Sequence, residues 1–243
     1  MFSVNYYKQG DCKHLEKLLE MYPDKPWNWY WVSRNSKITW KFVQEHLDFP
    51  KGSGYTIPWN WSMLSRNLNI TWEIVEENID KPWDWLWLSW NPSIPLKIVR
   101  NNPNKPWSWH YLSMHPDITW EIVRDIPDKP WDWIILSRNQ KIATWERVRD
   151  NPDKPWDWYG LSENPSVTTW EIVRDNPDKP WNWHTLSRNP KVATWEVVRD
   201  NLDKPWDWEE LSCSLNITWK ILRDNPSLPW NWDYLPRNIF KSP

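Results

Sequence analysis

The sequence predicts an all-α solenoid, in which short pairs of helices stack one after another. The first observation is a tandem motif close to Asn-Pro-Asp-Lys-Pro-Trp-Asp-Trp-x-x-Leu-Ser-x-Asn-Pro-x-Ile-Thr-Trp-Glu-Ile-Val-Arg-Asp, which holds most of the 28 tryptophans in the 243 residues. The second is the spacing between copies, which is 24 or 25 residues almost throughout and is typical of solenoid repeats. The third is an aromatic content of 16% with only four glycines, because disordered tracts are poor in aromatic residues.

Nine copies are counted from the proline that precedes each tryptophan pair. These prolines are Pro26, Pro58, Pro82, Pro106, Pro130, Pro155, Pro180, Pro205 and Pro229. Only the first interval is longer, at 32 residues, and it contains an insertion near residues 48–57. We therefore expect one repeat domain over residues 1–243, with an N-terminal capping helix and half-repeat at 1–22, nine repeats at 23–235 and a tail at 236–243.

Each copy is expected to begin with a short helix that contains the tryptophan pair. Proline is tolerated at the first helical position, where its missing N–H would have no partner. The Asp or Asn between the two tryptophans would then lie in the first turn, where an acidic group suits the helix dipole. In the sixth copy this helix is predicted over residues 155–163.

A second short helix is expected around the Thr-Trp-Glu triplet. In the sixth copy Thr169 is the predicted N-cap and Glu171 an acid in the first turn. Ile172 and Val173 are predicted to face inward before Asn176 and the following proline end the helix. Neither helix would be stable alone, because isolated helices shorter than ~12–15 residues are marginal in water.

Large rings are the expected source of the missing stability. A fully buried tryptophan removes ~200 Å² from water, an upper bound of roughly 5 kcal/mol at ~25 cal/mol per Å². The tryptophan of the second helix is assigned to the structural core; these residues are Trp40, Trp72, Trp120, Trp145, Trp170, Trp195 and Trp219. The tryptophan pairs form two further columns, and the sequence leaves open whether they are buried.

Charged residues also recur at fixed positions, with arginines beside aspartates in the second helix of most copies. The chain has 30 Lys and Arg against 32 Asp and Glu, and the two signs alternate inside each copy. Arginines interleaved with aromatic rings can follow a nucleic-acid strand, but such proteins carry a clearly basic stripe. We therefore expect ion pairs within and between copies, and no nucleic-acid partner.

No pattern of catalytic or metal-binding residues stands out. The sequence contains neither a phosphate-binding glycine loop nor a Gly-x-Ser-x-Gly elbow. The five histidines are scattered and no cysteine pair completes a set of metal ligands. The sequence thus predicts no enzymatic activity, no metal and no cofactor.

The expected location is intracellular. The first ten residues lack a basic start followed by an apolar run, and no stretch is apolar enough to span a membrane. Cys12 and Cys213 lie far apart in a linear stack, which argues against a disulfide between them. We expect a monomer that does not associate with membranes.

The positions that differ between copies are the candidates for partner binding. Two residues after the second tryptophan, the side chain is bulky in the first five copies and small or polar in the next three. Facing outward, this variable column would form an aromatic stripe of the kind favoured at interfaces; facing inward, it would only adjust packing. The insertion is either a partner-binding loop or a tolerated surface loop. The candidate partner-binding residues are Trp31, Met63, Trp87, Trp90, Tyr111, Phe49 and Tyr55.

The phrase Asn-Pro-Asp-Lys-Pro-Trp-Asp-Trp, followed by Leu-Ser-x-Asn-Pro and Ile-Thr-Trp-Glu-Ile-Val, resembles the tryptophan-rich tandem repeats of uncharacterised proteins encoded by giant DNA viruses of amoebae. The resemblance covers nearly the whole chain and implies a place in the host cytoplasm or the virion, but it implies no activity. More loosely, the order of its Asn-Pro, Leu-Ser and Asn-Pro elements is similar to the leucine-rich variant repeat, an α-solenoid.

From the residues alone we expect a non-enzymatic scaffold whose partner is another protein, because repeat arrays offer extended surfaces. If the chain is viral, that partner would be a host or virion protein. Two alternatives remain open: carbohydrate binding through an exposed tryptophan ladder, and a purely structural or assembly role.

Overall fold

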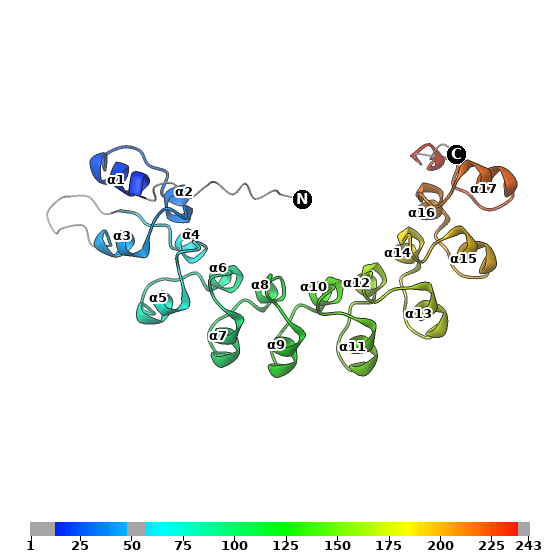
Figure 1. Cartoon of the computed structure of the whole chain (residues 1–243), viewed down its shortest axis with the longest axis horizontal. Coiled ribbons are helices and arrows are strands. Elements are labelled where there is room, and N and C mark those ends of the chain that lie inside the picture. Colours follow the sequence, from blue (N-terminus) through cyan, green and yellow to red (C-terminus); the bar gives the residue numbers. More distant parts are fainter. Residues whose placement is uncertain (1–12, 48–56, 238–243) are drawn as a thin grey trace. The chain divides into compact units, whose positions relative to one another are not determined.

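The chain is a repeat of short helices, seen here in a computed structural model that describes residues 13–47 and 57–237 (Figure 1). Within these ranges there are seventeen α-helices, one 3₁₀ helix and no strand. The prediction of an all-α solenoid is confirmed. None of the helices in the described ranges has the length and apolar character needed to cross a membrane.

The helices are of two alternating kinds. First helices each begin at the second tryptophan of a pair: α2 (Trp29–Arg34), α4 (Trp61–Ser65), α6 (Trp85–Trp90), α8 (Trp109–Ser113), α10 (Trp133–Arg138), α12 (Trp158–Glu163), α14 (Trp183–Arg188) and α16 (Trp208–Cys213). Second helices follow them: α3 (Trp40–Glu45), α5 (Trp72–Glu77), α7 (Leu96–Asn101), α9 (Trp120–Asp125), α11 (Trp145–Asp150), α13 (Trp170–Asp175), α15 (Trp195–Asp200) and α17 (Trp219–Asp224). The remaining elements are α1 (Lys13–Met21) and the 3₁₀ helix η1 (Leu235–Arg237).

Residue contacts group the chain into two compact units, unit 1 (Met1–Trp131) and unit 2 (Asp132–Pro243). In unit 1, α2 packs on α4, α4 on α6 and α6 on α8. In unit 2, α10 packs on α12, α12 on α14, α14 on α16 and α16 on η1. Within each unit the first helices therefore form one row, and the second helices form another beside it (Figure 1).

First helices start later than the sequence suggests. In the sixth copy Asp157 is the N-cap: its backbone is extended, and its carboxylate accepts a hydrogen bond from the N–H of Gly160 at 2.9 Å. Helix α12 therefore begins at Trp158, and the predicted start at Pro155 is wrong. The side chain between the two tryptophans satisfies a free N–H of the first turn, which is the role of an N-cap residue.

Second helices follow the prediction. Thr169 is the N-cap of α13 and its hydroxyl accepts a hydrogen bond from the N–H of Ile172 at 3.4 Å. Val173 is buried and Ile172 is half-buried. The helix ends at Asp175, and Asn176 is its C-cap.

The first tryptophan of each pair is the centre of the packing. From the second copy to the ninth these rings are only 5–7% exposed. The ring of Trp181 meets Trp158 of the preceding copy edge-on at 5.0 Å, and Trp145 of the copy before that at 6.0 Å. Its Nε1–H donates to the carbonyl of Asn176 at 2.9 Å. The same two ring contacts and the same hydrogen bond surround Trp83, Trp107, Trp206 and Trp230.

The tryptophans of the second helices are buried to very different extents. Trp40, Trp72 and Trp120 are buried, Trp145, Trp170 and Trp195 are half-buried, and Trp219 is 64% exposed. The prediction of a core position is therefore wrong for Trp219. A ring contact with the first tryptophan two copies later is made by Trp40, Trp72, Trp145, Trp170 and Trp195. No ring of the described residues covers Trp219 in this way.

Buried serines join adjacent first helices. The hydroxyl of Ser162 donates to the carbonyl of Trp158 at 2.7 Å and accepts the N–H of Asn182, in the next copy, at 3.0 Å. Ser65, Ser89, Ser187 and Ser212 each make the same two hydrogen bonds. These serines are buried, so the helix-to-helix contact is held by polar groups as well as by rings.

A buried asparagine extends this link between copies. The side chain of Asn91 donates to the carbonyls of Ser65 and Asn67 in the preceding copy, at 3.0 and 3.1 Å. Its Oδ1 accepts the N–H of Ser93 at 2.9 Å. One amide therefore satisfies backbone groups of two copies.

His115 occupies this asparagine position in the fourth copy. It is buried, and its Nδ1 accepts the N–H of Asp117 at 3.2 Å. The ring proton of the neutral form therefore lies on Nε2, which has no hydrogen bond of normal geometry. Burial lowers the pKa of His115, although the carbonyl of Asn91 and the charge of Asp117 oppose this shift.

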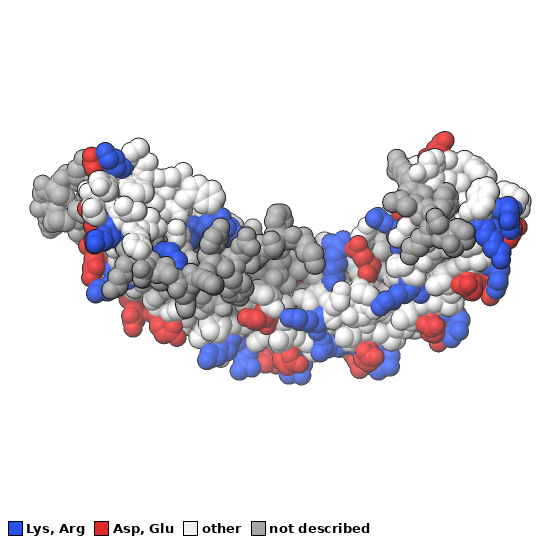
Figure 2. Space-filling view, turned by 45° about the horizontal axis from the view of Figure 1, so that its top comes forward, with Lys and Arg blue, Asp and Glu red and all other residues white. Residues whose placement is uncertain are grey.

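Charged side chains lie on the second helices. Arg–Asp neighbours pair in five copies: Arg124–Asp125, Arg149–Asp150, Arg174–Asp175, Arg199–Asp200 and Arg223–Asp224. Arg100 also reaches Asp125 of the next copy at 3.1 Å. Ion pairs within and between copies are thus confirmed, and blue and red side chains are interspersed along the lower part of Figure 2. Exposed pairs of this kind contribute little to stability.

We predict that the buried first tryptophans dominate stability. Replacing Trp181 by Ala should cost about 3–5 kcal/mol, as other large-to-small core changes do. Trp170→Ala should cost less, because that ring is half-buried. Trp232→Ala should change stability by no more than about 0.5 kcal/mol, because the ring is exposed. Urea unfolding of the three variants measures these losses of stability. Equal losses for Trp181→Ala and Trp232→Ala would contradict the prediction.

We also predict a pH dependence that comes from His115. Its folded pKa lies below the ordinary value near 6.5, so the unfolded chain binds more protons and stability falls as the pH drops below about 6.5. His115→Asn should restore the amide link, add about 0.5–1.5 kcal/mol and reduce this loss. Urea unfolding at pH values above and below about 6.5 tests this prediction. His110→Asn is the control, because His110 is exposed. An unchanged pH dependence in His115→Asn would refute the assignment.

Candidate functional site

The variable column, two residues after the second tryptophan of each pair, lies at the boundary between core and surface. Trp31 is 58% exposed, whereas Met63 is 4% exposed. Trp87, Tyr111 and Ile135 are half-buried, Gly160 and Thr185 are buried, and Glu210 and Tyr234 are half-buried. The column therefore neither faces wholly inward nor wholly outward, and each residue must be judged separately.

Three of the predicted site residues are not found on this surface. Met63 is buried, so its side chain is not accessible to a partner. Phe49 and Tyr55 lie outside the described residues. Trp31, Trp87, Trp90 and Tyr111 remain on or near the surface of unit 1.

Three successive first helices of unit 1 bring an arginine and three aromatic rings together. The guanidinium carbon of Arg66 lies 4.5 Å from the ring centroid of Trp87 and 4.7 Å from that of Trp90. Trp87 is 6.3 Å from Trp90 and 5.9 Å from Tyr111, between ring centroids. We call Arg66, Trp87, Trp90 and Tyr111 the Arg66 cluster. It forms because α4 packs on α6 and α6 on α8, which places these side chains at neighbouring positions of one row.

The charge of Arg66 is partly stripped of water. Burial lowers its pKa, the positive charge of Arg34 lowers it further, and Tyr30 and Tyr111 act in the opposite direction. An arginine keeps its charge at neutral pH even so, because its ordinary pKa exceeds ~12. The rings supply part of the lost stabilisation through cation–π contact. The cluster therefore presents a cation on an aromatic surface.

A second aromatic group lies on α2 in the same unit. Trp31 and Tyr30 meet edge-on at 4.9 Å, and the guanidinium carbon of Arg34 lies 5.6 Å from the Trp31 ring centroid. Sequence reasoning missed both arginines. The signal was present, because Arg34 and Arg66 occupy the position that Trp90 fills in the third copy.

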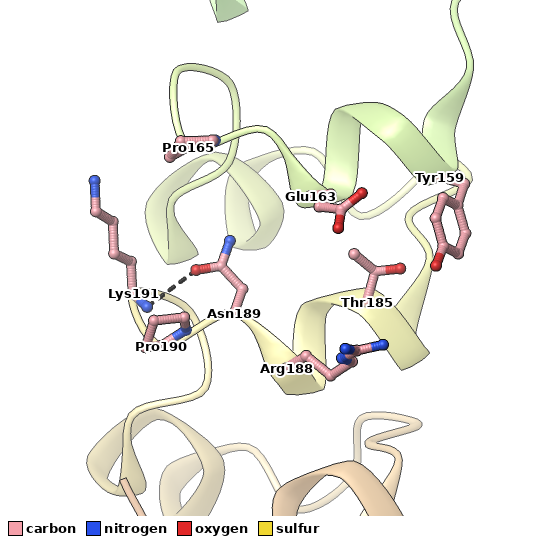
Figure 3. Close-up of a pocket in the computed structure, with 8 residues that line it drawn as sticks. All are labelled: Tyr159, Glu163, Pro165, Thr185, Arg188, Asn189, Pro190 and Lys191. Atoms are coloured by element: carbon pink, nitrogen blue, oxygen red, sulfur yellow. Dashed lines mark hydrogen bonds between the residues drawn. The ribbon is translucent and has the colours of Figure 1, made fainter. Parts of the chain in front are cut away.

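Unit 2 has a groove where the variable column is small. An open cavity of about 320 Å³ lies between α12 and α14, lined by Tyr159, Glu163, Pro165, Thr185, Arg188, Asn189, Pro190 and Lys191 (Figure 3). A β-carbon added to Gly160 would lie 2.9 Å from Cγ of Arg138, so this close packing favours glycine. Tyr159 is covered by Arg138 at 5.4 Å, a cation–π pair without a second aromatic ring.

Metal-ligating side chains do not gather in the described part of the chain: no three His, Cys, Asp or Glu residues there are placed to hold a metal ion. Cys213 is half-buried, and its thiol donates to the carbonyl of Tyr234 at 3.8 Å. The most distinctive chemistry on the described surface is therefore aromatic and cationic.

Known proteins add no assignment. The chain matches no family model, no curated protein and no solved structure. The class defined by the fold is that of all-α tandem-repeat proteins with tryptophan-bearing helices, and the resemblance to giant-virus repeats stays a prediction.

We predict that two residues of the variable column behave oppositely when truncated. Met63→Ala should cost about 2–5 kcal/mol, because it leaves a cavity in the core. Trp31→Ala should change the free energy of unfolding by no more than about 0.5 kcal/mol, because its ring is mostly in water. Urea unfolding of both variants tests the boundary, and a small loss for Met63→Ala would mean that its side chain is accessible.

Proposed function

We propose that this chain is a non-enzymatic repeat scaffold that binds another protein through the Arg66 cluster of unit 1. The observation that carries the proposal is one arginine in contact with two tryptophans, beside a tyrosine. Trp, Tyr and Arg are the residues most enriched at binding hot spots.

The rigidity of the surface supports this role. Trp87, Trp90 and Tyr111 lie on α6 and α8. The contact between these helices is fixed by the buried Ser89 and by the edge-on contact of Trp85 with Trp107. A binding surface that is already ordered loses little conformational entropy on association. Affinity then depends on the contacts and not on folding of the site.

The chemistry of the cluster suggests what it binds. The guanidinium of Arg66 lies over the rings of Trp87 and Trp90, and no carboxylate of the described residues forms an ion pair with it. An acidic group flanked by apolar side chains would pair with the cation and cover the rings. We therefore propose a protein segment with an Asp or Glu next to apolar residues; if the viral resemblance is correct, the segment belongs to a host or virion protein.

The carbohydrate alternative depends on an outward ladder of paired tryptophans. The first rings of the pairs are 5–7% exposed from the second copy on, and the second rings are half-buried against them in α4 to α16. This packing favours a protein partner over a sugar.

The proposal is tested with a library of displayed peptides, followed by affinity measurement of the enriched sequences by fluorescence anisotropy. Arg66→Ala and Trp90→Arg should each weaken binding by about tenfold or more, as hot-spot truncations do. Trp90→Arg introduces the residue that several other copies carry at this position.

The matched control is Arg138→Ala, which removes the cation–π pair with Tyr159 in unit 2. It should leave the affinity unchanged. Peptides that bind equally to all three variants, or a library from which nothing is enriched while glycans bind, would refute the proposal.

A further inference from the structure

Each buried first tryptophan of unit 2 that lies beyond α12 is held between two earlier copies. For Trp181 the walls are Trp145 and Trp158, whose ring centroids lie 6.0 and 5.0 Å away. We call this arrangement a ring socket. One wall comes from a second helix two copies earlier, and the other wall is the second tryptophan of the preceding copy.

The last ring socket has both walls and no ring between them. Its walls are Trp219 of α17 and Trp232, which are 64% and 63% exposed. An open cavity of about 470 Å³ lies there, lined also by Leu222, Pro226 and Leu235. No ring of the described residues lies between these walls.

The first copy has the complementary defect, a ring without walls. Trp27 makes the usual Nε1–H hydrogen bond, here to the carbonyl of Tyr22 at 2.8 Å. It is nevertheless only half-buried, whereas the later first tryptophans are 5–7% exposed. Among the described residues, no pair of tryptophans encloses Trp27 as Trp145 and Trp158 enclose Trp181.

Helix α1 stands where later copies have a second helix. Eleven residues separate Glu16 from Trp27, as eleven separate Trp170 from Trp181. In the ninth copy, the described residues end in η1 without a second helix. Among the described residues, the first element is therefore a second-type helix with no first helix before it, and the last is a first segment with no second helix after it.

The apolar residues of α1 also indicate that it takes the place of a second helix. Leu19 is buried, as expected for the inner face of a second helix. Leu18 is 43% exposed, whereas Ile172 at the equivalent phase of α13 is half-buried. The additional exposure is what the loss of one neighbouring copy would produce.

We propose that a second copy of this chain binds head to tail at these ends. Trp27 of one copy fills the ring socket between Trp219 and Trp232 of the other, and α1 packs beside α17 as the missing second helix. The contact is heterologous, so every added chain leaves the same two ends open and growth is linear. This self-association is independent of the proposed protein-binding function, which uses the Arg66 cluster.

Pro236 makes this junction weaker than a contact inside the chain. It occupies the phase of Ser187 and Ser212, whose hydroxyls accept an N–H from the next copy. Proline offers no hydroxyl, so the junction keeps the ring contact and lacks one hydrogen bond. A reversible, concentration-dependent association follows.

The test is sedimentation velocity of the full chain over roughly a hundredfold range of concentration, because association obeys mass action. The expected result is a series of dimers, trimers and longer species. Trp219→Ala, Trp232→Ala and Trp27→Ala should each weaken association by about tenfold or more. Leu18→Glu provides a second N-terminal variant if Trp27→Ala unfolds, as judged by circular dichroism. Trp90→Arg, which lies within unit 1, should associate like the wild type.

Mixing two variants tests whether the contact is head to tail. Trp27→Ala keeps an intact socket, and Trp219→Ala keeps an intact Trp27, so an equal mixture should form dimers that neither variant forms alone. Trp232→Ala should keep the affinity of the Arg66 cluster for its peptides, which separates failure of this proposal from failure of the proposed function.

Three outcomes would overturn the proposal. A chain that stays monomeric at all concentrations would mean that the socket does not bind a second copy. Association that stops at dimers and survives Trp27→Ala would indicate pairing of two C-terminal ends. Association that survives both Trp219→Ala and Trp232→Ala would place the contact elsewhere.

Discussion

The burial of one tryptophan per copy is the constraint on which the rest of the structure depends. Its helices are mostly six residues long, far below the length at which a helix is stable alone. The Trp-Asx-Trp tripeptide compensates within three residues: the first ring fills the core, the Asp or Asn caps the helix, and the second ring forms one wall around the next copy's ring. Because Trp83, Trp107, Trp181, Trp206 and Trp230 each contact two earlier copies, these copies have no complete core of their own.

Polar groups determine how adjacent copies are aligned. Rings tolerate small shifts against each other, but the hydroxyl of Ser162 must meet one particular N–H of the next copy. The asparagine link adds a second set of directional contacts, as at Asn91. His115 shows that this link can be altered, at the cost of one buried nitrogen without a hydrogen bond of normal geometry. Burial of the rings thus supplies most of the stabilisation, and hydrogen bonds determine the register.

The sequence predicted what is local and periodic. Thr169 and Asp175 bound the second helix of the sixth copy as a cap and a stop signal would indicate. The start of the first helix was misplaced, because an early proline and an Asp N-cap are both helix-start signals and only the backbone decides between them. The sequence also could not show that the first tryptophan of each pair is buried and the second only half-buried. Both recur with the same period, so the pattern does not distinguish them. The Arg66 cluster joins three copies, so it depends on side-by-side packing that no single copy encodes.

A stack in which every ring needs walls from earlier copies must leave open surfaces at its two ends. Solenoids usually cover their ends with polar capping repeats. Here Glu16 of α1 accepts hydrogen bonds from the N–H and the hydroxyl of Thr39, both at 2.8 Å, so part of the first end is polar. The other end keeps Trp219 and Trp232 in water, at a hydrophobic cost that a polar substitution would have removed. Retention of both rings, opposite a first ring that lacks its own walls, is easier to explain by a contact between chains than by an incomplete cap.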